Sequence, residues 1–121
     1  MPTILVVDDA EFLRIRLKKL LTHLNYTVQE APNGREALWL YKATRPDVVL
    51  MDVTMPEMDG LTALGEIRAF DGTARIIMLT ALGQNTVAEE ALRLGACGFV
   101  VKPFETSHII QSIELALVPA R

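Results

Sequence analysis

Residues 48–60 have the sequence VVLMDVTMPEMDG, in which a short apolar run ends at an acidic residue. The run Val48–Met51 is continuous rather than alternating with polar residues, a pattern typical of a parallel strand covered on both faces. Asp59 precedes a segment with apolar residues at helical spacing, so its side chain is placed to cap a helix. The stretch therefore predicts a buried strand, a loop and a helix, with Asp52 at the end of the strand.

The same unit, a short strand followed by a helix, recurs along the chain. Further apolar runs occupy residues 4–7, 26–28, 76–79 and 98–101. The run at 26–28 is shorter and more polar, as expected for an edge strand. Helical patterns follow the five runs, within residues 11–25, 33–41, 59–70, 87–94 and 109–117. Because helical crossovers between parallel strands place helices on both faces of a sheet, the predicted fold class is α/β, a doubly wound five-stranded parallel sheet.

Length and composition limit the function classes. The chain has 121 residues, of which 50% are hydrophobic and 22% charged, which is typical of one globular domain. Twelve basic and fifteen acidic residues give a net charge of -3, and without a basic run direct nucleic-acid binding is not expected. One cysteine and two histidines do not make a zinc site. No membrane span or signal peptide is evident, so we expect a cytoplasmic protein without membrane contact.

Chemically reactive side chains stand at the predicted strand ends. Asp8 and Asp9 follow the first strand, Asp52 the third, Thr80 the fourth and Lys102 the fifth. Because the carboxyl ends of parallel strands meet at one edge, these side chains should converge there. Clustered carboxylates need a compensating cation, and Mg²⁺ prefers oxygen ligands. Lys102 and Thr80 could bind phosphate oxygens, while one carboxylate could attack a phosphoryl group.

Four stretches together resemble the receiver domain of two-component response regulators. They are VVDD at residues 6–9, MDVTMPEMDG at 51–60, LTA at 79–81 and VKPF at 101–104. The resemblance implies a flavodoxin/CheY-like (βα)5 fold with strand order 2-1-3-4-5 and a single receiver domain over residues 1–121. It also implies a signalling domain rather than an enzyme, one that catalyses only its own phosphoryl transfer and dephosphorylation.

The resemblance assigns a role to each acidic residue of the cluster. Asp52 would be the phosphoacceptor, taking a phosphoryl group from the phosphohistidine of a sensor histidine kinase in a Mg²⁺-dependent reaction. Asp9 and Asp52 would ligate Mg²⁺ directly, together with the backbone carbonyl of Thr54. Asp8 would act through a metal-bound water, and Lys102 would pair with the phosphoryl group.

The resemblance also implies how the phosphorylated state is recognised and how long it lasts. Thr80 would hydrogen-bond the phosphoryl group and move toward it, and the aromatic ring of Phe99 would turn in response. The Lys102–Pro103 peptide bond would be cis. Thr54 and Leu82 match positions that vary within the family, and they would set the lifetime of the phosphoryl group.

Signal output is expected through partner binding, with chemotaxis as one candidate pathway. The binding face would be formed by the helix at residues 87–94, the strand that carries Phe99 and the helix at 109–117. Its partner would be a downstream target protein or a second copy of the chain. The alternative is that the chain is the receiver fragment of a longer response regulator.

Three other interpretations fit the sequence less well. A haloacid-dehalogenase-like phosphatase with an aspartyl-phosphate intermediate would need Asp-x-Asp after the first strand, where this chain has Asp8-Asp9-Ala10. A flavodoxin-like electron carrier would need a phosphate loop rich in Ser, Thr and Gly at the same place. A receiver that has lost phosphorylation conflicts with the complete acidic cluster.

Several other residues have a structural interpretation. Cys97 is expected to be a small buried thiol, and Trp39 is expected to be partly packed. The basic residues Arg14, Arg16, Lys18 and Lys19 are interpreted as the solvated face of the first helix, with kinase docking as a second possibility.

Overall fold

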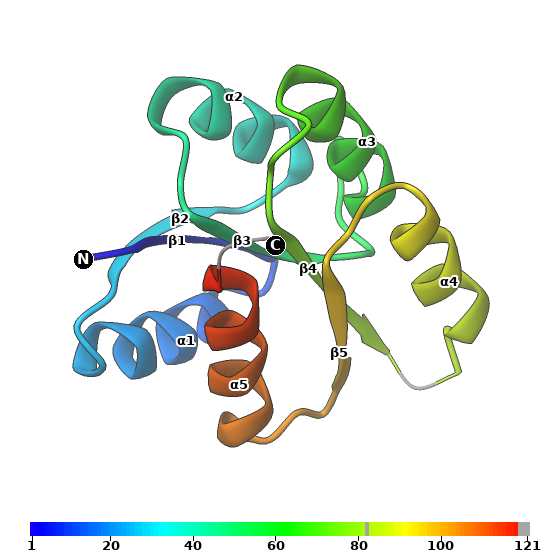
Figure 1. Ribbon diagram of the computed structural model, residues 1–121. Coiled ribbons are helices and arrows are strands. Elements are labelled where there is room, and N and C mark those ends of the chain that lie inside the picture. The colour runs from blue at the N-terminus through cyan, green and yellow to red at the C-terminus, as the bar shows by residue number, and fades with distance from the viewer. Residues whose placement is uncertain (82, 119–121) are drawn as a thin grey trace.

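Five parallel strands alternate with five helices in the computed structural model, which describes residues 1–81 and 83–118 (Figure 1). The strands are β1 (Thr3–Val7), β2 (Thr27–Ala31), β3 (Val48–Asp52), β4 (Ile76–Ala81) and β5 (Gly98–Lys102). The helices are α1 (Glu11–His23), α2 (Gly34–Thr44), α3 (Gly60–Phe70), α4 (Asn85–Arg93) and α5 (Thr106–Leu117). None of the helices described is long and apolar enough to cross a membrane.

The strands form one sheet in the order β2-β1-β3-β4-β5, which confirms the predicted fold class and strand order. All neighbouring strands are parallel. Helices α1 and α5 cover one face of this sheet, and α2, α3 and α4 cover the other (Figure 1). We refer to these as the α1/α5 face and the α2/α3/α4 face. The order turns back at β1, because β2 lies on one side of β1 and β3 on the other.

A separate apolar core fills each side of the sheet. The continuous runs of β1 and β3 are buried on both faces, because successive side chains of a strand point to opposite sides. Ile4 and Val6 pack against α1 and α5, while Leu5 and Val7 pack against α2 and α3. In contrast, β2 is polar and largely half-buried, as predicted for an edge strand.

Two predicted helix starts are confirmed by their hydrogen bonds. The side-chain oxygen of Asn33 accepts a bond from the amide of Glu36 at 2.9 Å, and that of Asp59 accepts one from the amide of Thr62 at 2.8 Å. Both bonds satisfy an amide that has no partner within the helix. The Glu36 carboxylate accepts a bond from the side-chain amide of Asn33, not from its backbone as a full capping box would require.

Two expectations about single residues are wrong. Trp39 is 69% exposed, because it lies opposite the buried Ala37 side of α2. Cys97 is exposed in the turn before β5, where its thiol donates to the carbonyl of Ile76 at 3.5 Å. Helix α1 ends at His23, within the predicted range 11–25, and Asn25 after it adopts a left-handed φ of 71°.

Two glycines let the loop between β3 and α3 pack closely against the end of β3 and the start of α2. The amide of Gly60 donates to the carbonyl of Val53 at 2.7 Å, and that of Gly34 donates to the carbonyl of Met58 at 3.0 Å. A Cβ atom at Gly60 would collide with the carbonyl oxygen of Asp52, and one at Gly34 would collide with that of Met58. Both obstacles are backbone atoms, so the loop could accommodate a larger residue only by moving.

We therefore expect Gly60→Ala to displace the loop that follows Asp52 and to lower the free energy of unfolding by about 2 kcal/mol or more. Gly65→Ala is the matched control, because it lies in the same helix with no atom within 4 Å of the added Cβ. The control should stabilise the protein by about 0.5–1 kcal/mol, as alanine does in a helix interior. Urea denaturation measures both changes, and equal stability of the two variants would contradict the packing argument.

Candidate functional site

The strand register directs three charged side chains to the same side of one sheet edge. Leu50 pairs with Val6, and Asp52 pairs with Leu79, which in turn pairs with Val100. Side chains alternate along a strand, so Asp8, Asp52 and Lys102 point to the same face as these apolar partners. This is the α1/α5 face. The convergence predicted from the strand ends therefore follows from the observed register.

One ammonium group joins the carboxylates of two strands. Lys102 Nζ lies 3.0 Å from Asp8 Oδ2 and 3.0 Å from Asp52 Oδ1, so it donates to both. The same Asp52 oxygen accepts from the amide of Val53 at 3.0 Å, and Asp8 Oδ1 accepts from the amide of Ala10 at 2.9 Å. These bonds hold both carboxylates in fixed orientations at the carboxyl ends of β1 and β3.

A third carboxylate completes the acidic cluster. One carboxylate oxygen from each of Asp8, Asp9 and Asp52 lies within 4.8 Å of the other two. Asp8 is 1% exposed and Asp52 is 9% exposed, whereas Asp9 is exposed and leaves the cluster open to solvent. Three carboxylates against the single ammonium of Lys102 leave an excess of negative charge. The residues therefore fit a hard divalent cation such as Mg²⁺, which takes carboxylate and carbonyl oxygens and keeps several waters.

Burial and hydrogen bonding act against each other at Asp52 and at Lys102, and the pKa of each group is raised. Burial raises the pKa of Asp52 above its ordinary value, and the charge of Asp8 adds to this, while the hydrogen bond from Lys102 opposes it. Burial acts to lower the pKa of Lys102, but its bonds to Asp52 and Asp8 outweigh burial and raise it overall. The side chain of Lys102 is therefore protonated and positively charged at neutral pH.

Those of the remaining predicted site residues that the structure describes lie on β4, on β5 and in the loops after β3 and β5. Thr80 is buried in β4 next to Val101 and points to the α2/α3/α4 face. Phe99 of β5 points to the same face, two residues before Val101, and is 43% exposed. Thr54 is exposed in the loop after β3, and Leu82 lies outside the described residues. The Lys102–Pro103 peptide bond is cis.

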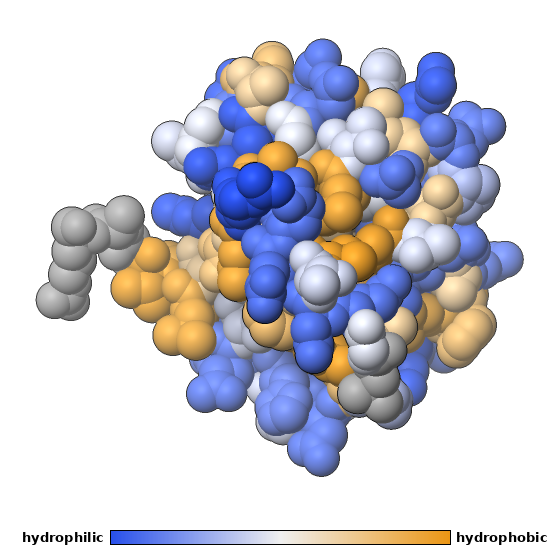
Figure 2. All heavy atoms as spheres, turned by 90° about the vertical axis from the view of Figure 1, so that its right-hand side faces the viewer, coloured by the Kyte–Doolittle hydropathy of each residue, from blue (hydrophilic) through white to orange (hydrophobic). Residues whose placement is uncertain are grey.

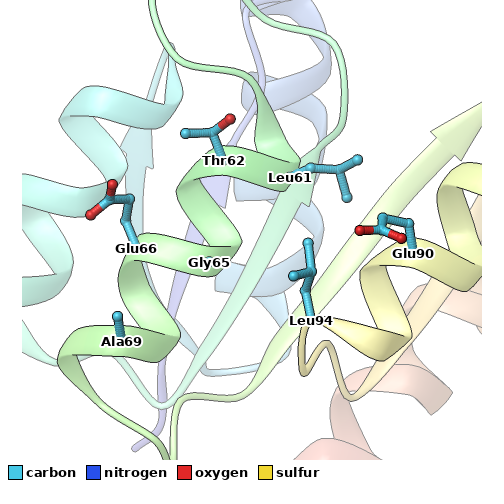
Figure 3. Close-up of a pocket in the computed structure, with 7 residues that line it drawn as sticks. All are labelled: Leu61, Thr62, Gly65, Glu66, Ala69, Glu90 and Leu94. Carbon is cyan, nitrogen blue, oxygen red and sulfur yellow. The ribbon is translucent and has the colours of Figure 1, made fainter.

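A separate hollow lies between α3 and α4. Hydrophobic side chains reach the surface between these helices, with hydrophilic ones around them (Figure 2). Leu61 from α3, Glu90 from α4 and Leu94, the residue directly after α4, point toward one another across it, and Gly65 lies along the α3 side (Figure 3). The hollow offers mainly apolar contacts and lacks the grouped carboxylates and ammonium of the acidic cluster. The chemistry that the sequence predicts therefore belongs to the strand ends.

One contact of the acidic cluster was not predicted. Arg14, interpreted from the sequence as part of a solvated basic face, donates to the backbone carbonyl of Asp8 at 2.6 Å. Its side chain is only 15% exposed. The sequence did hold a signal, because Arg14 stands in the first turn of α1, and helical side chains tilt back toward the start of their helix.

Comparisons with known proteins agree with this geometry. The family described as the response regulator receiver domain matches residues 4–114. The chemotaxis protein CheY of Thermotoga maritima is 47% identical over 111 residues, which cover 91% of this chain and 92% of that protein. CheY of Bacillus subtilis is 47% identical over 115 residues, which cover 94% and 96%. The crystal structure of the CheX-CheY-BeF3-Mg complex from Borrelia burgdorferi contains a similar chain, with a TM-score of 0.91, 36% identity and coverage of 97% and 90%.

The shared ammonium leads to a stability prediction. Lys102→Met keeps most of the side-chain volume but leaves Asp8 and Asp52 facing each other without a cation. We expect a loss of about 2 kcal/mol in the free energy of unfolding, which is below the range for fully buried pairs because Lys102 is 28% exposed. Added Mg²⁺ should recover part of this loss, because a bound cation replaces the missing charge.

Urea denaturation with and without Mg²⁺ measures both effects. Lys19→Met is the control, since it removes the same charge from an exposed position of α1 and should change stability by less than about 0.5 kcal/mol. A Lys102→Met protein as stable as the wild type in the absence of Mg²⁺ would contradict the proposed role of the ammonium.

Proposed function

The chain belongs to the family of response regulator receiver domains, and from this premise we propose that Asp52 accepts a phosphoryl group from the phosphohistidine of a sensor histidine kinase. Receiver domains are the phosphoacceptors of two-component signalling and are not enzymes of the usual kind. The observation that carries the assignment to Asp52 is its position: it is buried, bonded to Lys102 and grouped with Asp8 and Asp9.

The proposed transfer is a nucleophilic displacement at phosphorus. An oxygen of the ionised Asp52 carboxylate forms the new P–O bond while the P–N bond to the kinase histidine breaks, and the electron pair of that bond returns to the imidazole, which then takes up a proton. Asp52 must be ionised to attack. Lys102 favours this ionised form, and its ammonium is within reach of the oxygens that gain negative charge.

Asp9, Asp52 and the backbone carbonyl of Thr54 are the proposed direct ligands of Mg²⁺, with Asp8 acting through a bound water. When bound, Mg²⁺ would supply positive charge for the phosphoryl oxygens. Two findings support this proposal: the oxygens of the three carboxylates lie close together, and the similar receiver structure from Borrelia burgdorferi is a complex with Mg²⁺ and BeF3. Lys102 would turn from the carboxylates to the phosphoryl group as the new charge forms.

The output is proposed to be a change in partner binding at the face of α4, β5 and α5. Thr80 would bond the phosphoryl group, and Phe99, which is 43% exposed, would turn inward as Thr80 moves. Their shared face and diagonal register support this coupling. The bound partner would be a downstream target or a second copy of the chain. Chemotaxis is the proposed pathway, since the Thermotoga and Bacillus relatives described above are chemotaxis proteins and the Borrelia structure pairs CheY with CheX.

Three further assignments complete the proposal. Thr54 and Leu82 would set the lifetime of the phosphoryl group by controlling how water reaches Asp52. Thr54 is exposed and lies two residues after Asp52, the last residue of β3. This position supports its role in controlling how water reaches Asp52. Residues 1–121 are proposed to form a single receiver domain that acts in the cytoplasm.

Phosphorylation should be confined to Asp52. A small phosphodonor with Mg²⁺ should add one phosphoryl mass to the wild-type chain and none to Asp52→Asn, because the amide cannot act as the nucleophile. Asp47→Asn is the control: Asp47 lies at the opposite end of β3, where its side chain accepts from the amide of Thr3, which an amide oxygen can also do. Intact-mass spectrometry gives the result, and equal labelling of wild type and Asp52→Asn would overturn the assignment.

The proposed switch predicts where a phosphoryl mimic acts. Beryllofluoride with Mg²⁺ should shift the backbone amide signals of residues 52–54 and also those of Thr80 and residues 97–104, since movement of Thr80 gives Phe99 room to turn. Replacing Thr80 with Val keeps its shape without the hydroxyl, so this variant should keep the shifts near Asp52 and lose those around Phe99. NMR shifts confined to residues 52–54 in the wild type would contradict the coupling.

A further inference from the structure

The loop that carries two of the three acidic residues is held by contacts outside the acidic cluster. Asp8 continues the β1 ladder, because its amide donates to the carbonyl of Ala31 at 3.2 Å. Asp9 comes next, and its exposed side chain has no hydrogen bond or ion pair with any residue that the structure describes. The direction of the Asp9 carboxylate therefore depends on the backbone, and above all on the peptide group that joins Asp8 to Asp9.

Arg14 bonds directly to this peptide group. Its Nη1 atom donates to the carbonyl oxygen of Asp8 at 2.6 Å, a charge-assisted bond. Because a peptide group is planar, fixing its oxygen also fixes the bond that leads into Asp9. Arg14 lies in the first turn of α1, and its own amide donates to the carbonyl of Ala10 at 3.1 Å. The side chain thus reaches back across the loop and anchors it to the helix.

Glu30 of β2 holds the guanidinium from the other side. Its Oε1 atom lies 3.4 Å from Arg14 Nε, and its Oε2 atom lies 3.5 Å from Lys18 Nζ. Glu30 pairs with Val6 in the sheet, so it projects onto the α1/α5 face where α1 passes. Glu30 does two things at once: it fixes the orientation of Arg14, and it balances a positive charge that would otherwise repel a cation at the acidic cluster.

We propose that Arg14, held by Glu30, is a positioning residue for the divalent cation: it fixes the Asp8–Asp9 peptide so that the Asp9 carboxylate already lies beside Asp8 and Asp52 before a cation binds. This inference rests on the proposed function, which assigns Mg²⁺ to these carboxylates. Arg14 touches neither the cation nor the phosphoryl group. It acts through the backbone, by reducing the reorganisation that cation binding requires.

The sign of the effect separates positioning from plain electrostatics. Removing a positive charge near a cation site should strengthen cation binding if charge alone mattered. Removing a positioning contact should weaken it. Arg14→Ala is therefore expected to bind Mg²⁺ more weakly by about tenfold, the lower end of the range for groups that orient metal ligands. Arg14→Lys keeps the charge but lacks the planar fork that bonds two partners, so it should restore only part of the affinity.

The experiment is a Mg²⁺ titration of the isotopically labelled full chain, followed through the backbone amide signals of residues 8–10 and 52–54. The readout is cation affinity in folded molecules, so a loss of global stability alone does not change it. Glu30→Gln is a second variant: it leaves Arg14 in place without its ionic partner, and it should also weaken binding. Lys19→Ala is the matched control, because it removes one positive charge from an exposed position of α1, and it should bind as the wild type does.

The outcomes distinguish this inference from the function on which it rests. Weaker binding by Arg14→Ala and Glu30→Gln, with unchanged binding by Lys19→Ala, is the expected result. Equal or tighter binding by Arg14→Ala, with normal binding by the wild type, would overturn the positioning role alone. If Asp9→Asn binds Mg²⁺ with the same affinity as the wild type, the metal site itself is overturned, and the inference with it.

Discussion

The ammonium group of Lys102 between the carboxylates of Asp8 and Asp52 is the interaction on which the functional edge of the sheet depends. It joins β5 to β1 and β3, and it has to pass over β4 to do so. The register partner of Lys102 on β4 is Ala81, whose small side chain leaves a path for the long lysine stem. Without this cation, two buried carboxylates would face each other, and one of them would have to take up a proton. Strand order, register and side-chain size together therefore place the ammonium of Lys102 between the carboxylates of Asp8 and Asp52.

The acidic cluster adds little to the stability of the fold. The apolar core has to offset the free energy lost when the charges of the cluster are buried. Buried ion pairs rarely repay the loss of hydration of their charges, and here three carboxylates share one ammonium. The two apolar cores, one on each side of strands β1 and β3, supply the stability. The close approach of Gly60 to the backbone of Asp52 then keeps the following loop near the sheet. The site is thus a locally unfavourable charge arrangement held by a rigid scaffold. This supports the proposal that it responds to an added cation or phosphoryl group.

The sequence predicts most of this structure where the decisive interactions are local or periodic. Continuous apolar runs identify the strands, and the caps at Asn33 and Asp59 depend on residues within one helical turn. The grouping of the acidic residues also follows, because strand ends of a parallel sheet must meet. Exposure of single residues does not follow in this way. The exposure of Trp39 depends on how its helix is rotated against the sheet, and that rotation is set by packing between distant segments. The burial of Arg14 depends on the same rotation, although its position in the first turn of α1 already indicates that its side chain can reach the preceding loop.

The face on which each site residue lies constrains how a signal can travel. Asp52 and Lys102 point to the α1/α5 face, whereas Thr80 and Phe99 point to the α2/α3/α4 face. In the proposed switch, a change at Asp52 would therefore have to pass from one face of the sheet to the other before it reached Phe99. Within the sheet the path is blocked by close-packed apolar side chains, which resist small displacements. At the carboxyl edge the strands end, and Thr80 is the last buried residue of β4 there, with Ala81 beyond it exposed. The position of Thr80 at this edge supports the proposal that charge on one face alters packing on the other through this residue.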